Sequence, residues 1–154
     1  MKRKGWGKLI VTAIWLALVQ FPVLGQSLHF NSTEVEYNNQ PVKVSLLHQD
    51  WQGFIWLGTS YGLLRYTGTN YQLFSLPGDS ATAQPVSAIY EDSEKQLWVG
   101  FNDGTLAKRQ GQKLAPVIAL QKYINTPITA ILEAKDKTLW VSTYGQGVYY
   151  AKER

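Results

Sequence analysis

The sequence predicts an all-β fold of three similar sheets, and two observations lead to this prediction. Three tryptophans are spaced by 42 residues, and each lies in a short apolar segment: Trp56, Trp98 and Trp140. An aliphatic residue followed by a small hydroxyl residue keeps the same spacing upstream, in Val44-Ser45, Val86-Ser87 and Ile128-Thr129. A period of about 40 residues built from short strands is typical of β-propeller blades. We therefore predict three four-stranded blades that form an open arc, which is an incomplete propeller.

The first 25 residues are predicted to form a signal-peptide helix ahead of this fold. They start with basic residues, continue with an apolar segment from Leu9 to Val19, and end in Val23-Leu24-Gly25, which suits a cleavage site. The apolar segment is shorter than the roughly 20 residues that a spanning helix needs, which favours cleavage over a membrane anchor. We expect an exported chain that starts at Gln26 and meets a membrane only during export.

The charge balance excludes one class of partner. The chain has 15 Lys and Arg residues against 11 Asp and Glu residues, but Lys2, Arg3, Lys4 and Lys8 lie in the predicted signal peptide. Without these four, 11 basic residues face 11 acidic ones, so the remainder is formally neutral. A neutral body with scattered charges lacks the basic surface that binds nucleic acid.

The lead-in and the first two blades can be placed along the chain. Residues 26–43 form the lead-in, in which a strand over 28–30 is expected to serve as the outer strand of the last blade. Blade 1 is predicted over 44–85, with strands at 44–49, 54–59, 63–66 and 71–76. Blade 2 is predicted over 86–127, with strands at 86–91, 96–101, 105–109 and 113–119. Pro116 suits its outermost strand, because proline cannot donate to a sheet ladder.

The third blade is predicted to be incomplete. It covers residues 128–154, with strands at 128–133, 139–143 and 148–151 and no fourth strand before residue 154. Propellers usually contain about four to eight blades. Three blades would leave an apolar face open at each end of the arc, and such a face is either an interaction surface or an aggregation liability.

The repeated residues are interpreted as structural. The three tryptophans are expected to be buried between blades. Trp98 is expected to contribute most to stability, because blades flank it on both sides. Gly58 and Gly100 are expected to let the neighbouring blade approach, and Ser142 replaces this glycine in the third repeat. Asp50 and Asp92 are expected to bond turn amides. Ala134 takes that place in the third repeat, while Lys95 and Lys137 stand where the first repeat has Gly53.

These residues resemble the two-component regulator propeller repeat. In that pattern an apolar strand ends in Asp, as at Asp50, and a Gly-apolar-Trp-apolar-Gly-Thr strand follows, as in residues 53–59. A Gly-Leu turn then leads into an Arg-Tyr strand, as in Gly62-Leu63 and Arg65-Tyr66. The other repeats keep fewer of these positions, namely Asp92, Trp98, Gly100, Gly104, Trp140, Thr143, Gly145 and Gly147.

This resemblance implies a function and a location. Such repeats occur in the periplasmic sensor regions of hybrid histidine kinases, many of them from Bacteroidetes. By resemblance, the chain is expected in the periplasm of a Gram-negative bacterium. It would be a fragment or truncated form of such a sensor, with any kinase activity in a part that lies downstream.

Signs of catalysis or metal binding are weak. His29 and His48 are the two histidines, and no acids stand near them at metal-ligand spacing. Gly145-Gln146-Gly147 lacks the helix and third glycine of a phosphate-binding loop. The acids Glu91, Asp92 and Asp136 are interpreted as turn residues. We expect no enzyme activity, no metal and no cofactor.

Candidate ligand-binding residues come from the turns between the second and third strands. If these turns share one face of the arc with the blade connections, they present aromatic, amide and acidic side chains together. Such groups suit a small polar ligand such as an oligosaccharide, although turns favour these residue types in any case. The candidates are Tyr61, Asn102, Asp103, Tyr144 and Gln146.

Three functional hypotheses remain open. The first is a non-enzymatic exported sensor segment that works with further blades of a longer protein. The second is a self-assembling module in which two copies close a six-bladed ring. The third is part of a propeller lyase or hydrolase, for which Asp103 would be the residue to substitute.

Overall fold

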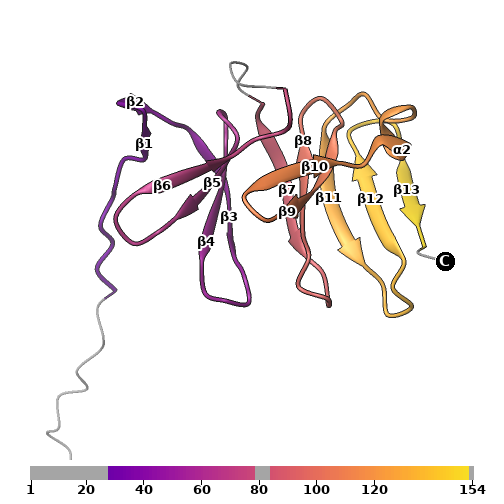
Figure 1. The fold of residues 1–154 in the computed structure, drawn as a ribbon, viewed down its shortest axis with the longest axis horizontal. Helices are drawn as coiled ribbons and strands as arrows, with labels where there is room; N and C mark the ends of the chain where they lie inside the picture. Colours follow the sequence, from indigo (N-terminus) through magenta and orange to yellow (C-terminus); the bar gives the residue numbers. More distant parts are fainter. Residues whose placement is uncertain (1–27, 79–83, 153–154) are drawn as a thin grey trace, which may run out of the picture. The chain divides into compact units, whose positions relative to one another are not determined.

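The computed structural model describes residues 28–78 and 84–152, so the predicted signal peptide lies outside the described residues (Figure 1). The chain divides into two compact units, Met1–Thr33 and Glu34–Arg154. In the described part of the first unit, residues 28–33 contain no strand. The expected strand over 28–30 is therefore not formed, since a strand needs hydrogen bonds to a neighbouring strand and these residues pair with none. No helix within 28–78 or 84–152 is long and apolar enough to cross a membrane.

The second unit consists mainly of three antiparallel sheets, which confirms the predicted all-β propeller architecture (Figure 1). The first sheet contains β3 (Val44–Gln49), β4 (Ile55–Thr59), β5 (Leu63–Tyr66) and β6 (Tyr71–Phe74). The second contains β7 (Val86–Glu91), β8 (Leu97–Phe101), β9 (Leu106–Gln110) and β10 (Lys113–Pro116). The third contains β11 (Ile128–Glu133), β12 (Leu139–Thr143) and β13 (Val148–Ala151). In the described chain the third blade thus has three strands rather than four.

Two short elements were not predicted. The helix α2 (Ile118–Gln121) follows β10, which ends at Pro116 instead of continuing to residue 119. A small hairpin of β1 (Glu36–Tyr37) and β2 (Gln40–Pro41) lies in the lead-in. Its turn residues Asn38 and Asn39 have φ angles of 53° and 58°. Asparagine tolerates this left-handed conformation, so the Asn-Asn pair was a usable hairpin signal.

The three blades lie side by side in chain order, with their first strands adjacent. Strand β7 contacts β3 and β4, and β11 contacts β7 and β8. Two apolar clusters fill the two spaces between the blades. The cluster between blades 1 and 2 includes Trp56, Phe74 and Val99, and the cluster between blades 2 and 3 includes Leu106, Ile128 and Val141. Packing between neighbouring blades is therefore the core of this fold.

Each first strand carries a bulge at its small hydroxyl residue. The pairing register shifts between Val44 and Leu46, between Val86 and Ala88, and between Ile128 and Ala130. The residues skipped by the pairing are Ser45, Ser87 and Thr129. Ser45 Oγ donates to the carbonyl of Gly58 at 3.1 Å and lies 3.4 Å from the carbonyl oxygen of Val86. The small hydroxyl residue of each repeat therefore marks a repeated β-bulge.

The repeated glycines allow close contact between blades, as predicted. A Cβ atom on Gly58 would stand 3.0 Å from Val86 Cγ1, and one on Gly100 would stand 2.6 Å from Ile128 Cγ2. In both cases the opposing residue begins the first strand of the next blade. Side chains at these positions would push the blades apart.

Candidate functional site

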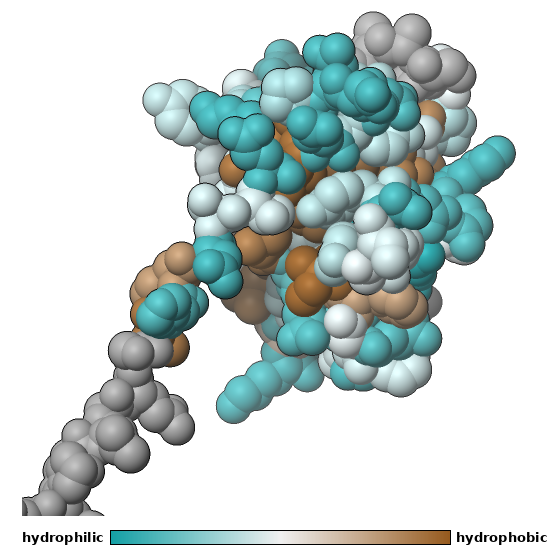
Figure 2. All heavy atoms as spheres, turned by 90° about the vertical axis from the view of Figure 1, so that its left-hand side faces the viewer, coloured by the Kyte–Doolittle hydropathy of each residue, from teal (hydrophilic) through white to brown (hydrophobic). Residues whose placement is uncertain are grey.

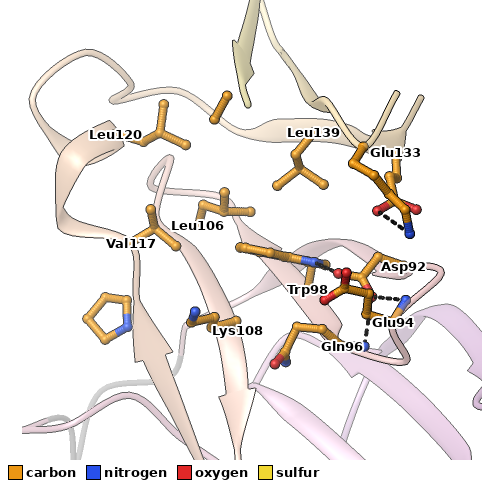
Figure 3. A pocket seen from close by; sticks show the side chains of 13 residues that line it. Asp92, Glu94, Gln96, Trp98, Leu106, Lys108, Val117, Leu120, Glu133 and Leu139 are labelled. Carbon is orange, nitrogen blue, oxygen red and sulfur yellow. Dashed lines mark hydrogen bonds and ion pairs between the residues drawn. The ribbon is translucent and has the colours of Figure 1, made fainter. Parts of the chain in front are cut away.

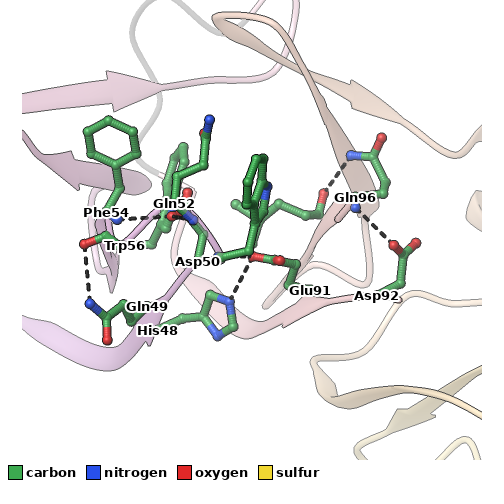
Figure 4. Close-up of polar contacts among 12 residues, drawn as sticks. His48, Gln49, Asp50, Gln52, Phe54, Trp56, Glu91, Asp92 and Gln96 are labelled. Atoms are coloured by element: carbon green, nitrogen blue, oxygen red, sulfur yellow. Dashed lines mark hydrogen bonds and ion pairs between the residues drawn. The ribbon is translucent and has the colours of Figure 1, made fainter. Parts of the chain in front are cut away.

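An Asp–Trp pair links the first turn of each of the first two blades to its second strand. Asp50 Oδ1 accepts hydrogen bonds from the amides of Gln52 and Phe54, and its Oδ2 accepts from Trp56 Nε1 at 2.8 Å (Figure 4). Asp92 repeats all three bonds, including one of 2.7 Å from Trp98 Nε1. The turn interpretation of these acids is confirmed. The bond to the indole was not anticipated, although the constant six-residue spacing of Asp and Trp is its sequence signal.

A glutamate at the end of the first strand joins neighbouring blades. Glu91 Oε2 accepts from the amide of Trp51 at 3.0 Å, and Glu133 Oε2 accepts from the amide of Ser93 at 3.1 Å. Glu91 also lies 3.7 Å from His48 Nε2 (Figure 4). The interpretation of Glu91 as a turn acid was therefore wrong, because its carboxylate reaches across to the preceding blade.

The three repeated tryptophans differ in burial. This contradicts the prediction that all three are buried and that Trp98 contributes most to stability. Trp56 is fully buried, Trp98 is partly buried and Trp140 is 39% exposed. The indoles of Trp56 and Trp98 each face the blade that follows in the chain. Trp56 meets Arg109 of blade 2, Trp98 lines a cleft against blade 3, and in the described chain no blade covers Trp140. Burial therefore depends on what lies beyond each blade.

The turns between second and third strands lie at the same end as the blade connections, as expected. The amides of Ser60, Asn102 and Tyr144 donate to the carbonyls of Lys43, Pro85 and Pro127, respectively. Each acceptor residue lies just before the first strand of its own blade. These three equivalent bonds define one end of the arc, which we call the upper end.

The five candidate ligand residues occupy this upper end but are spread over three blades. Tyr61 packs against Tyr37, with ring centroids 5.6 Å apart, and Tyr144 is 73% exposed. Asp103 accepts from the amide and hydroxyl of Thr105, and Gln146 accepts from Asn125 and Thr126, so both stabilise local loops. Asn102 lines an open cleft of about 380 Å³ with Ser45, Ser60 and Ser87. Of the five, Asn102 alone lines this cleft.

A second cleft of about 420 Å³ lies between blades 2 and 3 and was not predicted. Figure 3 shows the Trp98 ring between apolar side chains at one end and acids at the other. The apolar end contains Leu106, Val117 and Leu120. The acidic end contains Asp92, Glu94 and Glu133.

In the ranges 28–78 and 84–152, no group of three or more His, Cys, Asp or Glu side chains is placed to hold a metal ion.

The pKa of the Asp136 carboxyl lies below its ordinary value because of its hydrogen bonds to the Thr138 side chain and to Lys152, whose Nζ lies 3.2 Å from Oδ2. This pair lies on the surface.

The fold and its repeated contacts define an open arc of β-propeller blades. The model of the two-component regulator propeller family matches residues 80–103 and 122–145 of this chain. The two matches contain the first two strands of blade 2 and of blade 3, whereas the first repeat has the fullest form of the pattern.

Three solved structures from B. thetaiotaomicron share this fold. One is the extracellular domain of BT3049, assigned as a hybrid two-component system, with 16% identity and a TM-score of 0.58 over 78% of this chain. Two are extracellular domains of BT4673, assigned as a one-component system in one and a hybrid two-component system in the other. They have 17% and 18% identity and TM-scores of 0.56 and 0.57 over 79% and 77% of this chain. The chain spans only 18%, 17% and 16% of these three chains. No curated protein matches it significantly.

Proposed function

We propose that this chain is a non-enzymatic, exported sensor segment whose upper end contributes to recognition of an extracellular polar ligand. The observation that carries the proposal is the match to the two-component regulator propeller model together with a fold shared with extracellular domains of one- and two-component systems. In this proposal the chain is a fragment or truncated form of a longer periplasmic sensor. Any kinase activity belongs to another part of that protein.

The ligand class follows from the side chains at the upper end. Tyr61 and Tyr144 are exposed aromatic rings, and Asn102 lines the upper cleft together with the exposed Ser60. Exposed rings stack on the apolar faces of sugar rings, while amides and hydroxyls exchange hydrogen bonds with sugar hydroxyls. We therefore propose an oligosaccharide. Asp103 and Gln146 would act through the loops that they stabilise.

An oligosaccharide array probed with the full chain tests this proposal. We expect specific binding that Tyr144→Ala and Asn102→Ala each weaken. Tyr150→Ala is a matched control, because Tyr150 is 69% exposed, close to the 73% of Tyr144, and lies on β13 outside the upper turns. Equal effects of Tyr144→Ala and Tyr150→Ala would count against an upper-end site, and no binding to any sugar would count against this ligand class.

A second candidate function is assembly of two copies into a closed ring. Leu47 of blade 1 and Ile131 of blade 3 occupy equivalent positions. Ile131 is only 7% exposed because blade 2 covers it, whereas Leu47 is 72% exposed because no blade of the described chain covers that face of blade 1. Trp140, Leu132 and Tyr150 are exposed at the opposite end. In Figure 2, which faces the left-hand side of the Figure 1 view, hydrophobic patches lie amid hydrophilic residues. Light scattering on the full chain tests this candidate, and a folded monomer at high concentration would exclude it.

A further inference from the structure

The two interfaces between blades differ at the ring of the repeated tryptophan. Trp56 is flanked by two guanidinium groups, with Arg65 Cζ 5.7 Å and Arg109 Cζ 5.6 Å from its ring centroid. Arg65 belongs to the same blade as Trp56, whereas Arg109 comes from blade 2. At Trp98 the residue from the same blade is Lys108, whose Nζ lies 6.0 Å from the ring centroid. In the part of blade 3 that the structure describes, residues 128–152, there is no arginine to lie over the Trp98 ring.

The pairing register identifies the residue that stands where the second arginine would be. Trp98 pairs with Lys108, and Arg109 follows Lys108 on β9. Trp140 pairs with Tyr150, and Ala151 follows Tyr150 on β13. Ala151 is therefore the counterpart of Arg109, and it lines the cleft of about 420 Å³ beside Trp98. At this position the second interface lacks the arginine side chain that contacts the tryptophan of the first.

The same cleft also has a more negative charge than its counterpart. Glu94 stands where the first interface has Gln52, since each follows the turn aspartate by two residues and donates its amide to that aspartate. The positions around Trp56 hold two acids and three bases, namely Asp50, Glu91, Arg65, Lys95 and Arg109. The equivalent positions around Trp98 hold three acids and two bases, namely Asp92, Glu94, Glu133, Lys108 and Lys137. The formal charge thus changes from +1 to −1.

Two of the three acids are already engaged, which leaves Glu94 to receive a ligand. Asp92 accepts from Trp98 Nε1 and from two turn amides. Glu133 accepts from the amide of Ser93 and lies 3.9 Å from Lys137 Nζ. Glu94 is exposed and lines the cleft with its side chain.

We propose that the cleft between blades 2 and 3 binds a guanidinium group from a ligand, in the place that Arg109 occupies at the first interface. A planar guanidinium stacks on an indole face and donates two parallel hydrogen bonds to a carboxylate, which an ammonium group cannot do. The Trp98 ring provides the stacking face, and Glu94 is the acceptor. Leu106, Val117 and Leu120 contact the aliphatic part of the ligand.

Binding measurements on the full chain test this site with matched probes. N-acetyl-L-arginine amide represents an arginine in a peptide, agmatine represents a free guanidinium compound, and N-acetyl-L-citrulline amide is a neutral isostere. We expect both guanidinium probes to bind at least about tenfold more tightly than the citrulline probe, because the neutral group loses both the cation–π contact and the ion pair. Tighter binding of the arginine amide than of agmatine indicates a peptide ligand, and the reverse indicates a free small molecule. The indole NH signal of Trp98 should shift, while that of Trp56 should not.

Two variants make the assignment specific. Glu94→Gln restores the residue type of the first interface and should weaken arginine-amide binding at least about threefold. Ala151→Arg supplies the missing guanidinium from the chain itself and should abolish binding, with Ala151→Ser as a control that keeps it. Equal affinity for arginine and citrulline amides, or unchanged binding in both Glu94→Gln and Ala151→Arg, would overturn the proposal.

Discussion

Gly100 and Ile128 are in such close contact that a Cβ atom on the glycine would stand 2.6 Å from Ile128 Cγ2. The same relationship holds between Gly58 and Val86, where the distance would be 3.0 Å. The third repeat has Ser142 at this position, and its hydroxyl lies 2.8 Å from Thr129 Oγ1 in the same blade. A blade packed on the outer face of blade 3 would therefore meet the Ser142 side chain where the first two interfaces have only a glycine.

Replacing Gly100 should loosen the interface between blades 2 and 3. Gly100→Ala places a methyl group against Ile128, and overpacking of this kind costs about 1–3 kcal/mol. Chemical denaturation measures the loss. Ser142→Ala removes a hydroxyl at the equivalent position of the uncovered blade and should change stability by less than about 0.5 kcal/mol. Similar effects of both substitutions would show that the glycine is not a contact point.

The buried Asp–Trp pair should make a large contribution to stability. Asp50→Ala leaves two turn amides and the Trp56 indole without their acceptor, which should cost about 2–4 kcal/mol. Asp92→Ala should cost less, because Trp98 is only partly buried and water can replace the carboxylate. Thermal denaturation of the two variants tests this order, and an equal loss would contradict the role of burial.

The third blade lacks this aspartate, so restoring it should stabilise the protein. Its turn has the same backbone bonds, with the amide of Lys137 donating to the carbonyl of Ala134 as that of Lys95 donates to Asp92. Ala134→Asp should place a carboxylate near Trp140 Nε1 and add about 1 kcal/mol. The same substitution combined with Trp140→Phe is the control, because phenylalanine has no indole donor. A gain of equal size in the control would assign the effect to the turn amides alone.

The cost of truncating each tryptophan should decrease along the chain. Trp56→Ala removes a fully buried ring and should cost about 3–5 kcal/mol. Trp98→Ala should cost less, since a cleft already lies beside its ring, and Trp140→Ala should cost below about 1 kcal/mol. Urea denaturation of the three variants checks this order. A large loss for Trp140→Ala would mean that another surface covers it in solution, as the assembly candidate requires.

Lys95 occupies a backbone conformation that favours glycine. Its φ angle is 69°, close to the 88° of Gly53 at the same place in blade 1. Lys95→Gly should therefore raise stability by up to about 1 kcal/mol, because it relieves left-handed strain. Gly53→Ala should lower stability by a similar amount for the opposite reason. Differential scanning calorimetry compares them, and a destabilised Lys95→Gly would show that the lysine side chain contributes a contact of its own.

The sequence by itself determined the architecture of the protein. The 42-residue spacing of tryptophans, bulge hydroxyls and glycines is sufficient to place three blades and all eleven of their strands, because each repeat has to satisfy the same local packing. Repetition also marked Asp50 and Asp92 as turn residues. The short hairpin around Asn38 was missed because it precedes the first repeat, and the helix after Pro116 was missed because residues 113–119 were expected to form one strand.

The tertiary structure decided what each repeated residue contacts. Identical positions have different environments, because the face of a blade is covered only where another blade follows. This is why Trp56 is buried and Trp140 is exposed, and why Glu91 joins two blades instead of holding a turn. It is also why one alanine, Ala151, leaves a cleft beside Trp98 where Arg109 covers Trp56. Each blade interface combines residues from two repeats. The 42-residue spacing identifies equivalent positions in the repeats, but it does not show which residues of the next blade each position contacts.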